Sequence, residues 1–307
     1  SRVRRVIVDA EARATGVEVI GPGGITSYSA RQEVILSAGA VDTPKLLQLS
    51  GIADGAHLQS LGIPLVRHLP AVGKNLQDHL CASFYYRSTV PTLNDELGTI
   101  FGQARQALRY ILTRRGPLAL SVNQAGAFLR GSPEEERPNI QLYFNPLSYR
   151  IPTDPKAGLK PEPYSGFLLA FNSCRPTSRG SVSIVSPELT DAPQIRPNYL
   201  GTVHDEEEVI QGSRLVRRIM EAPALRAITE MEMPPSVEAR TDEELLTYFR
   251  GNSGSIYHLC GSAAMGPDAS SSVVDASLKV HGINGLRIVD ASVFPNITAG
   301  NINAPTM

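Results

Sequence analysis

Residues 33–51 read EVILSAGAVDTPKLLQLSG, and this stretch decides the fold class. Its apolar start has the composition of a buried strand, and the small residues Ser37–Ala40 follow. Asp42 and Thr43 are candidate N-caps of a helix, the next residue is a proline suited to a first helical position, and Gly51 is a stop signal. A strand that passes through a small-residue turn into a helix lets the backbone approach a nucleotide closely, although many α/β folds make this turn for packing.

The residues before this stretch predict a small meander of strands. Residues 3–8, 16–20 and 25–37 alternate or run apolar, and GPGG at 21–24 separates the last two as a turn. Together with the strand-to-helix unit, they predict an α/β domain over residues 1–80.

From residue 81 the pattern changes to polar alternation, prolines and longer connections, which predicts an α+β domain with an antiparallel sheet over residues 81–250. Apolar spacing predicts a helix over 97–112, and the acidic start and basic end of residues 205–220 match the dipole of another helix. Thr241 and Glu244 have the spacing of a capping box. Three further runs are predicted as strands: 139–145, 166–172 and 181–185.

The last part of the chain returns to a close-packed α/β pattern. Strands are predicted over 272–280 and 286–292, on either side of the turn HGING. The loop PNITAGNINAP at 295–305 then leads into the start of a helix. We expect residues 251–307 to re-enter the first domain.

Composition argues against several kinds of partner. The formal net charge is -1 with acids and bases interspersed, so neither nucleic acid nor an anionic membrane surface is expected. No apolar run approaches the roughly 18 residues of a membrane span. Cys81, Cys174 and Cys260 form no CxxC pair, and no two histidines have the spacing of a helical metal site. We therefore expect no disulfide framework and no metal, and of the compartments the cytoplasm is favoured.

Three motifs in order carry a resemblance to a known family. GAVDTPKLLQLSGI at 39–52, AVGKNLQDHL at 71–80 and YHLCGSAAMG at 257–266 resemble signatures of the glucose–methanol–choline oxidoreductases, and residues 273–306 are similar to that family's C-terminal motif. The segments LNDEL, RRGPLALSVNQAGAF and RPTSRGSVSI also have family counterparts, so the likeness covers the whole chain. The resemblance implies a choline dehydrogenase-like flavoprotein that uses FAD to oxidise an alcohol to a carbonyl.

Alcohol oxidation requires a base for the hydroxyl proton, a donor beside the developing alkoxide, and a flavin held against the reacting carbon. By resemblance, His258 is the base and Asn301 is the partner that holds the alcohol oxygen. Histidine suits the first role because its pKa lies near the working pH. A single histidine after a tyrosine is otherwise more often a packing residue, and the motif is what favours catalysis. We expect His79 to support the fold rather than transfer protons.

The resemblance also implies contacts to FAD. Asp290 and Ala291 follow a predicted strand, and a role as a helix or turn cap is the alternative for Asp290. A helix that opens at Asn303 would direct its positive end at the flavin and stabilise negative charge on the reduced ring. The other positions that the resemblance assigns to FAD are Gly39, Ala40, Asn75, Asp78, Pro305 and Thr306. Loop organisation is the alternative for Asn75 and Asp78.

Gln124 is the one residue assigned to the substrate. It aligns with an acidic residue of the choline dehydrogenases, and a quaternary ammonium group prefers a carboxylate or an aromatic cage. A neutral glutamine therefore favours an uncharged alcohol over choline. Oxygen and a quinone are both open as the electron acceptor.

The family holds the ADP part of FAD with a GxGxxG turn, and this motif is absent from the 307 residues. We therefore expect the C-terminal part of a longer flavoenzyme, cut inside structured elements at both ends, with a partial FAD-binding domain and no activity by itself. Two alternatives remain open: a flavin-containing lyase of the same fold, and a non-catalytic half-chain that needs a partner.

Overall fold

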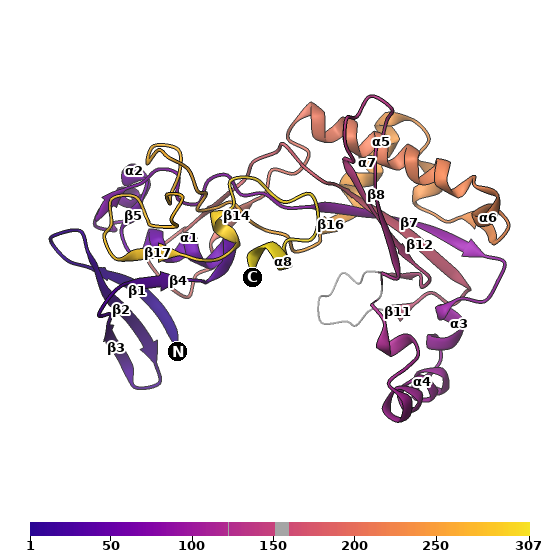
Figure 1. Cartoon of the computed structure of the whole chain (residues 1–307), viewed down its shortest axis with the longest axis horizontal. Helices are drawn as coiled ribbons and strands as arrows, with labels where there is room; N and C mark the ends of the chain where they lie inside the picture. The colour runs from indigo at the N-terminus through magenta and orange to yellow at the C-terminus, as the bar shows by residue number, and fades with distance from the viewer. Residues whose placement is uncertain (122, 151–159) are drawn as a thin grey trace. The chain divides into compact units, whose positions relative to one another are not determined.

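The computed structural model describes residues 1–121, 123–150 and 160–307. They form two compact units, each assembled from separate parts of the chain (Figure 1). Unit 1 consists of Ser1–His79, Arg175–Thr202 and Ile256–Met307, and unit 2 of Leu80–Cys174 and Val203–Ser255.

Unit 1 contains short strands and helices. Its elements are β1 (Arg2–Val8), β2 (Ala14–Gly21), β3 (Gly24–Ser29), β4 (Val34–Leu36), α1 (Gly39–Leu49), β5 (Ile52–Ala53), α2 (Gly55–Ser60), β6 (Arg67–His68), β13 (Ser181–Ser183), β14 (Gln194–Arg196), β17 (Leu286–Ile288), the 3-10 helix η3 (Ala291–Val293) and α8 (Asn303–Thr306). β1, β2 and β3 form an antiparallel meander, and β4 pairs in parallel with β17. β5 pairs in parallel with β6, and β13 antiparallel with β14.

Two predicted strands of unit 1 are not continuous. The run 25–37 divides into β3 and β4, because the polar residues 31–33 interrupt it and β4 leaves the meander to pair with β17. The run 272–280 forms only isolated bridges, among them the one between Val274 and Val280. Both predictions of an unbroken strand were wrong: β4 pairs with a strand from the far end of the chain, and residues 272–280 make only single bridges with residues nearby.

Helix α1 begins earlier than the sequence predicts. Its first residue is Gly39, and Pro44 lies inside the helix rather than at its start. The predicted cap Thr43 directs its hydroxyl to the carboxylate of Asp290, at 2.6 Å. Because that carboxylate comes from the far end of the sequence, local pattern could not reveal it.

Residues 175–202 pack in unit 1, whereas we predicted a single domain over 81–250. The side chains of Val182 and Ile184 in this segment are buried. Gln48 of α1 holds this segment by its backbone, since Nε2 donates to the Val182 carbonyl at 3.0 Å and Oε1 accepts from the Ile184 amide at 2.9 Å. The segment Arg175–Thr202 therefore belongs to unit 1.

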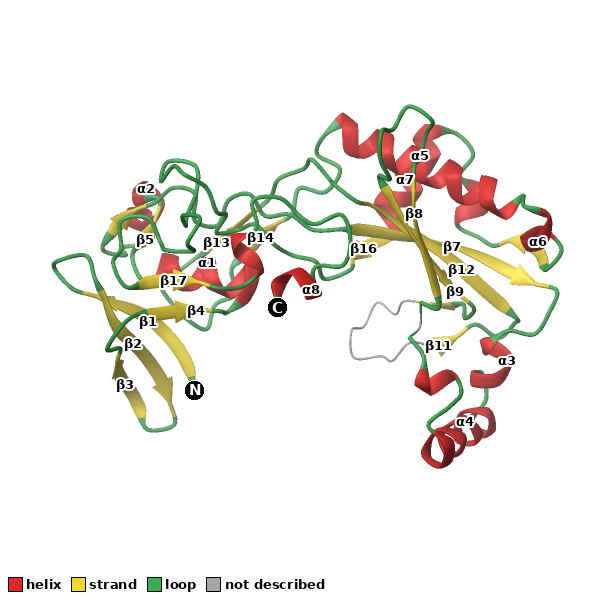
Figure 2. Ribbon diagram, viewed as in Figure 1, coloured by secondary structure: helices red, strands yellow, loops and turns green. Residues whose placement is uncertain are grey.

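Unit 2 is organised around one sheet (Figure 2). Its elements are β7 (Leu80–Ser88), α3 (Leu93–Leu97), α4 (Ile100–Thr113), the 3-10 helix η1 (Pro117–Ala119), β8 (Ala125–Leu129), β9 (Ile140–Asn145), β10 (Tyr149–Arg150), β11 (Lys160–Pro161), β12 (Gly166–Ser173), α5 (Val203–Met220), α6 (Pro223–Arg226), β15 (Thr229–Glu232), the 3-10 helix η2 (Ser236–Glu238), α7 (Asp242–Asn252) and β16 (Ser253–Ser255). The strand order is β15-β7-β12-β9-β8, with β16 also paired to β7, and all these pairs are antiparallel as predicted.

Helices α5 and α7 pack on this sheet, α5 against β12 and α7 against β7. Aromatic rings fill the interface, with Phe171 centred 5.5 Å from Phe249 and 6.1 Å from Phe84. Gly212 lets α5 approach closely, because a Cβ at this position would lie 2.2 Å from the Phe171 ring. This contact explains a glycine in the middle of a helix, where it normally costs about 1 kcal/mol relative to alanine.

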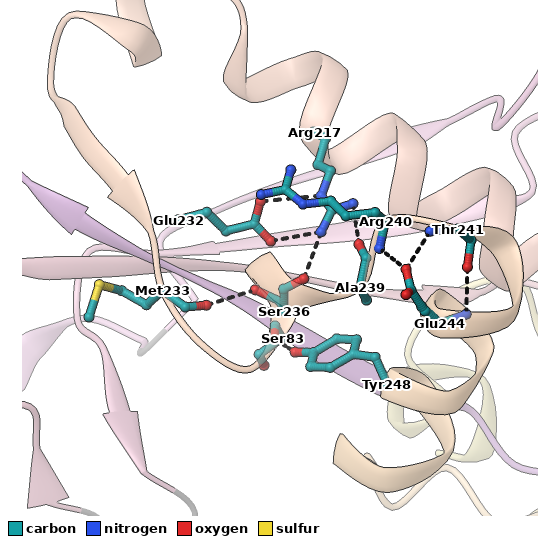
Figure 3. A network of polar contacts seen from close by, with 10 residues as sticks. All are labelled: Ser83, Arg217, Glu232, Met233, Ser236, Ala239, Arg240, Thr241, Glu244 and Tyr248. Atoms are coloured by element: carbon teal, nitrogen blue, oxygen red, sulfur yellow. Dashed lines mark hydrogen bonds and ion pairs between the residues drawn. The ribbon is translucent and has the colours of Figure 1, made fainter.

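Arg217 of α5 connects the helix to strand β15 and to the segment that follows it (Figure 3). Its guanidinium forms two hydrogen bonds with Glu232, of 3.1 and 3.2 Å. It also donates to the carbonyl oxygens of Ala239, at 2.6 Å, and Ser236, at 2.7 Å. Such a planar, multidentate arrangement is specific to arginine.

Candidate active site

His258 and Asn301 form the centre of the candidate site in unit 1. Nδ2 of Asn301 lies 3.2 Å from Nε2 of His258, although the two residues are 43 positions apart. His258 is buried, with 7% of its surface exposed, whereas the preceding Tyr257 is 88% exposed. The structure thus brings together the two residues that the sequence pattern pairs.

Asp78 fixes the backbone beside His258. One carboxylate oxygen accepts a hydrogen bond from the His258 amide at 2.9 Å, and the other accepts from the hydroxyl of Tyr199 at 2.5 Å. Tyr257 has a φ of 64°, a left-handed conformation that residues with a side chain rarely adopt. The hydrogen bond from the His258 amide to Asp78 therefore helps to hold a strained turn. Tyr199 was not found from sequence, because it lies outside every motif.

The environment of His258 favours its neutral form. Burial lowers the pKa of His258 below its ordinary value, and the negative charge of Asp78 acts in the opposite direction. A histidine with a lowered pKa is unprotonated at neutral pH, which is the state required of a proton acceptor.

A second histidine lies against the first. Nδ1 of His79 is 2.8 Å from Nδ1 of His258, with ring centroids 5.1 Å apart and ring planes at 83°. His79 is fully buried, and its carbonyl accepts a hydrogen bond from the Ile256 amide at 3.2 Å. Sequence pattern placed His79 in a motif next to Asp78, but it gave no sign of this contact.

Asn75 and Gln77 hold together loops from distant parts of unit 1. Asn75 Nδ2 donates to the carbonyl oxygens of Gly261, at 3.2 Å, and Pro295, at 3.3 Å. Gln77 also donates to Pro295, at 3.1 Å, and accepts from the Ile297 amide at 3.1 Å. These contacts agree with loop organisation, the alternative given for Asn75.

Asp290 connects the end of β17 to the start of α1. Its Oδ2 accepts hydrogen bonds from the Gly39 amide, at 2.9 Å, and the Thr43 hydroxyl, at 2.6 Å. Its Oδ1 accepts from the Ser292 amide at 2.8 Å and thereby caps η3. The carboxylate therefore caps η3 and binds the start of α1.

The remaining predicted site residues make backbone hydrogen bonds or are exposed. The carbonyl of Ala40 accepts from the Ser262 hydroxyl at 2.5 Å, and that of Ala291 accepts from the Gly261 amide at 3.2 Å. Gln124 is exposed in unit 2, just before β8. Its backbone N–H donates to the Phe144 carbonyl at 3.0 Å. The other three, Asn303, Pro305 and Thr306, are exposed in the four-residue helix α8.

Within the described ranges, no cluster of three or more His, Cys, Asp or Glu side chains has an arrangement that could hold a metal ion. None of the helices in the described part of the chain combines the length and apolar character that crossing a membrane requires.

Comparisons with known proteins agree on one family. Models described as GMC oxidoreductase match residues 1–81 and 176–307. The oxygen-dependent choline dehydrogenase of Pseudomonas fluorescens (strain Pf0-1) is 40% identical over 91% of this chain and 48% of its own length. The alcohol dehydrogenase [acceptor] of Pseudomonas putida is 39% identical over 90% of this chain and 49% of its own.

Solved structures show the same fold. A variant of the Aspergillus oryzae RIB40 formate oxidase, solved for the effect of a mutation on FAD modification, superimposes with a TM-score of 0.87 and 26% identity. The match covers 99% of this chain and 57% of that one. The chain therefore spans about half the length of the relatives it matches.

Proposed function

Because the chain belongs to the GMC oxidoreductase family, whose cofactor is FAD, we propose that it carries the catalytic pair of an enzyme that oxidises an alcohol to a carbonyl. The observation that supports this most directly is the 3.2 Å contact between Asn301 Nδ2 and His258 Nε2. It aligns a hydrogen-bond donor with the nitrogen that would take a proton.

In this proposal His258 is the base. Its Nε2 accepts the hydroxyl proton of the alcohol, so the O–H bond breaks and an N–H bond forms. When the alcohol binds, its hydroxyl hydrogen replaces the Asn301 hydrogen at Nε2, and the amide of Asn301 donates to the alcohol oxygen instead. A donor already aimed at the oxygen stabilises the negative charge that develops there.

The surroundings of the pair fit FAD. Tyr257 and residues 303–306 are exposed. Gly39 has a φ of 84° with nothing within 4 Å of the position a Cβ would take. The buried hydroxyl of Ser292 has no hydrogen-bond partner among the described residues. When bound, FAD supplies the acceptor for the hydride that leaves the alcohol carbon.

We assign the contacts to FAD to Gly39 and Ala40 at the start of α1, Asp290 and Ala291 after β17, and residues 303–306. Asn75 and Asp78 act through the loops that they organise, which carry His258. Gln124 contacts the substrate, and its neutral amide favours an uncharged alcohol over choline.

His258→Ala tests the proposal in the completed, FAD-loaded protein, which includes the part that supplies the GxGxxG turn. We expect the rate of flavin reduction by alcohol to fall by about 100- to 10,000-fold, the usual contribution of a general base, with the FAD content unchanged. Stopped-flow absorbance of the flavin under anaerobic conditions measures this rate, and choline beside an uncharged alcohol tests the substrate class. His204→Ala, a histidine with a half-exposed side chain in unit 2, is the control. Reduction of the His258→Ala flavin at the wild-type rate would remove His258 from the mechanism.

A further inference from the structure

The contact between His79 and His258 restricts where the protons of both rings lie. Two Nδ1 atoms 2.8 Å apart form a hydrogen bond only if one carries a hydrogen and the other does not. The contact alone does not say which ring donates.

Asn301 decides the direction. An amide nitrogen donates hydrogen bonds and does not accept them, so Nε2 of His258 must be the acceptor in the contact with Asn301. A neutral imidazole with an unprotonated Nε2 carries its hydrogen on Nδ1. His258 therefore donates from Nδ1 to Nδ1 of His79, which accepts.

From this geometry we infer that His79 is a positioning residue for the reaction: by accepting a hydrogen bond at its Nδ1, it orients the ring of His258 and keeps Nε2 unprotonated toward the substrate. This inference rests on the proposed function of His258. After Nε2 takes the hydroxyl proton, the hydrogen on Nδ1 remains directed at His79, so the ring keeps its orientation.

The surroundings suit this role. His79 is fully buried, and its backbone carbonyl accepts a hydrogen bond from the Ile256 amide. The backbone that carries the imidazole is therefore fixed. The carboxylate of Asp78 engages the backbone of His258 and not Nδ1 of its ring. The partner of Nδ1 is thus an imidazole rather than a carboxylate, which favours a base that does not retain a proton before the substrate arrives.

Three substitutions at His79 separate the acceptor from the bulk of the ring. In His79→Asn the amide oxygen takes the place of Nδ1 and can accept the hydrogen bond. In His79→Leu, which has nearly the same shape, no acceptor remains. In His79→Gln the amide lies farther out, near the position of Nε2, and does not replace Nδ1.

The FAD-loaded variants are compared by flavin reduction at saturating alcohol. We expect His79→Leu and His79→Gln to reduce flavin about 100-fold more slowly than wild type, as for a misplaced catalytic group, and His79→Asn to stay within several-fold. His79→Gln retains a polar side chain and provides the comparison if His79→Leu does not fold. His281→Asn is the control, because His281 is hydrogen-bonded to Ser272 and Gly266 in unit 1.

Equal rates in His79→Asn and His79→Gln, or a wild-type rate in His79→Leu, would overturn the inference. His258→Ala in the same assay separates this outcome from failure of the proposed function. If His258→Ala is slow and His79→Leu is not, only the positioning role is lost. If His258→Ala is as fast as wild type, the proposed function itself fails.

Discussion

Asp78 shows how one side chain supports another without touching its ring. Its two oxygens accept hydrogen bonds from the His258 amide and the Tyr199 hydroxyl, and the first of these secures a turn with a left-handed residue. The sequence placed Asp78 in a motif and left open whether it contacts FAD or its own loop. Only the fold reveals which backbone group it binds, because His258 lies 180 positions away.

We expect Asp78→Ala to lower the free energy of unfolding by about 1–3 kcal/mol, the cost of leaving a buried amide unpaired. Asp78→Asn should cost less, because an amide oxygen can still accept from the His258 amide. Tyr199→Phe removes only the second hydrogen bond and serves as the comparison. Urea denaturation of the three variants measures the order, and an Asp78→Ala protein as stable as wild type would contradict it.

The lowered pKa of His258 also predicts how stability depends on pH. Because the pKa is lower in the folded chain than its ordinary value of 6.5, the unfolded chain binds more protons between these two values. The unfolding free energy that comes from keeping His258 neutral is therefore fully present above about pH 6.5. It is lost as the pH falls through the lower pKa of the folded chain. In His258→Gln, unfolding free energies between pH 5 and 7.5 should lack this component, and a slope identical to wild type would refute the prediction.

Among the elements, those stabilised by local contacts were predictable. The capping box of Thr241 and Glu244 is present at the start of α7, because its partners lie three residues apart. The charge pattern of α5 likewise marked a real helix, found over Val203–Met220. The start of α1 was predicted too late, since Asp290 takes the hydroxyl of Thr43. Sequence thus locates helices, but misplaces an end that a distant residue organises.

At the scale of elements, Arg217 is expected to be the strongest single link of α5. Arg217→Met should destabilise unit 2 by about 3 kcal/mol, because Glu232 then remains as a poorly exposed carboxylate without its partner. Arg214→Met, on the same helix as Arg217, removes an exposed pair with Asp242 of α7 and should cost at most about 1 kcal/mol. Thermal melting compares the two, and equal losses would contradict this reading of the network in Figure 3.

For the whole molecule, the sequence indicated two domains and a return of the chain to the first. It did not indicate the second return over residues 175–202, because β13 and β14 are short and the segment is held by Gln48 and by backbone hydrogen bonds to Gly73 and Leu76, far away in the sequence. Nor did it indicate the contact of His79 with His258, since the direction of a side chain follows from packing. Motif order identified the pair His258 and Asn301, and packing supplied the rest of the site.

The separate cores predict separate responses to mutation. In amide hydrogen exchange followed by mass spectrometry, Asp290→Ala should accelerate exchange around residues 39–43 and 290–293, which contain the three groups that donate to that carboxylate. Arg217→Met should accelerate exchange around 229–249 instead. Faster exchange in both regions in either single variant would show that the units do not respond separately.

The bond between Gly39 and Asp290 joins residues 251 positions apart. A ribosome adding about 5–20 residues per second needs on the order of 10–50 s to make the stretch between them. During that time β4 has left the exit tunnel without β17, its parallel partner, and α1 is without the carboxylate at its start. Within this chain, β4 and the start of α1 therefore wait for residues 286–290 before their pairing and hydrogen bonding are complete.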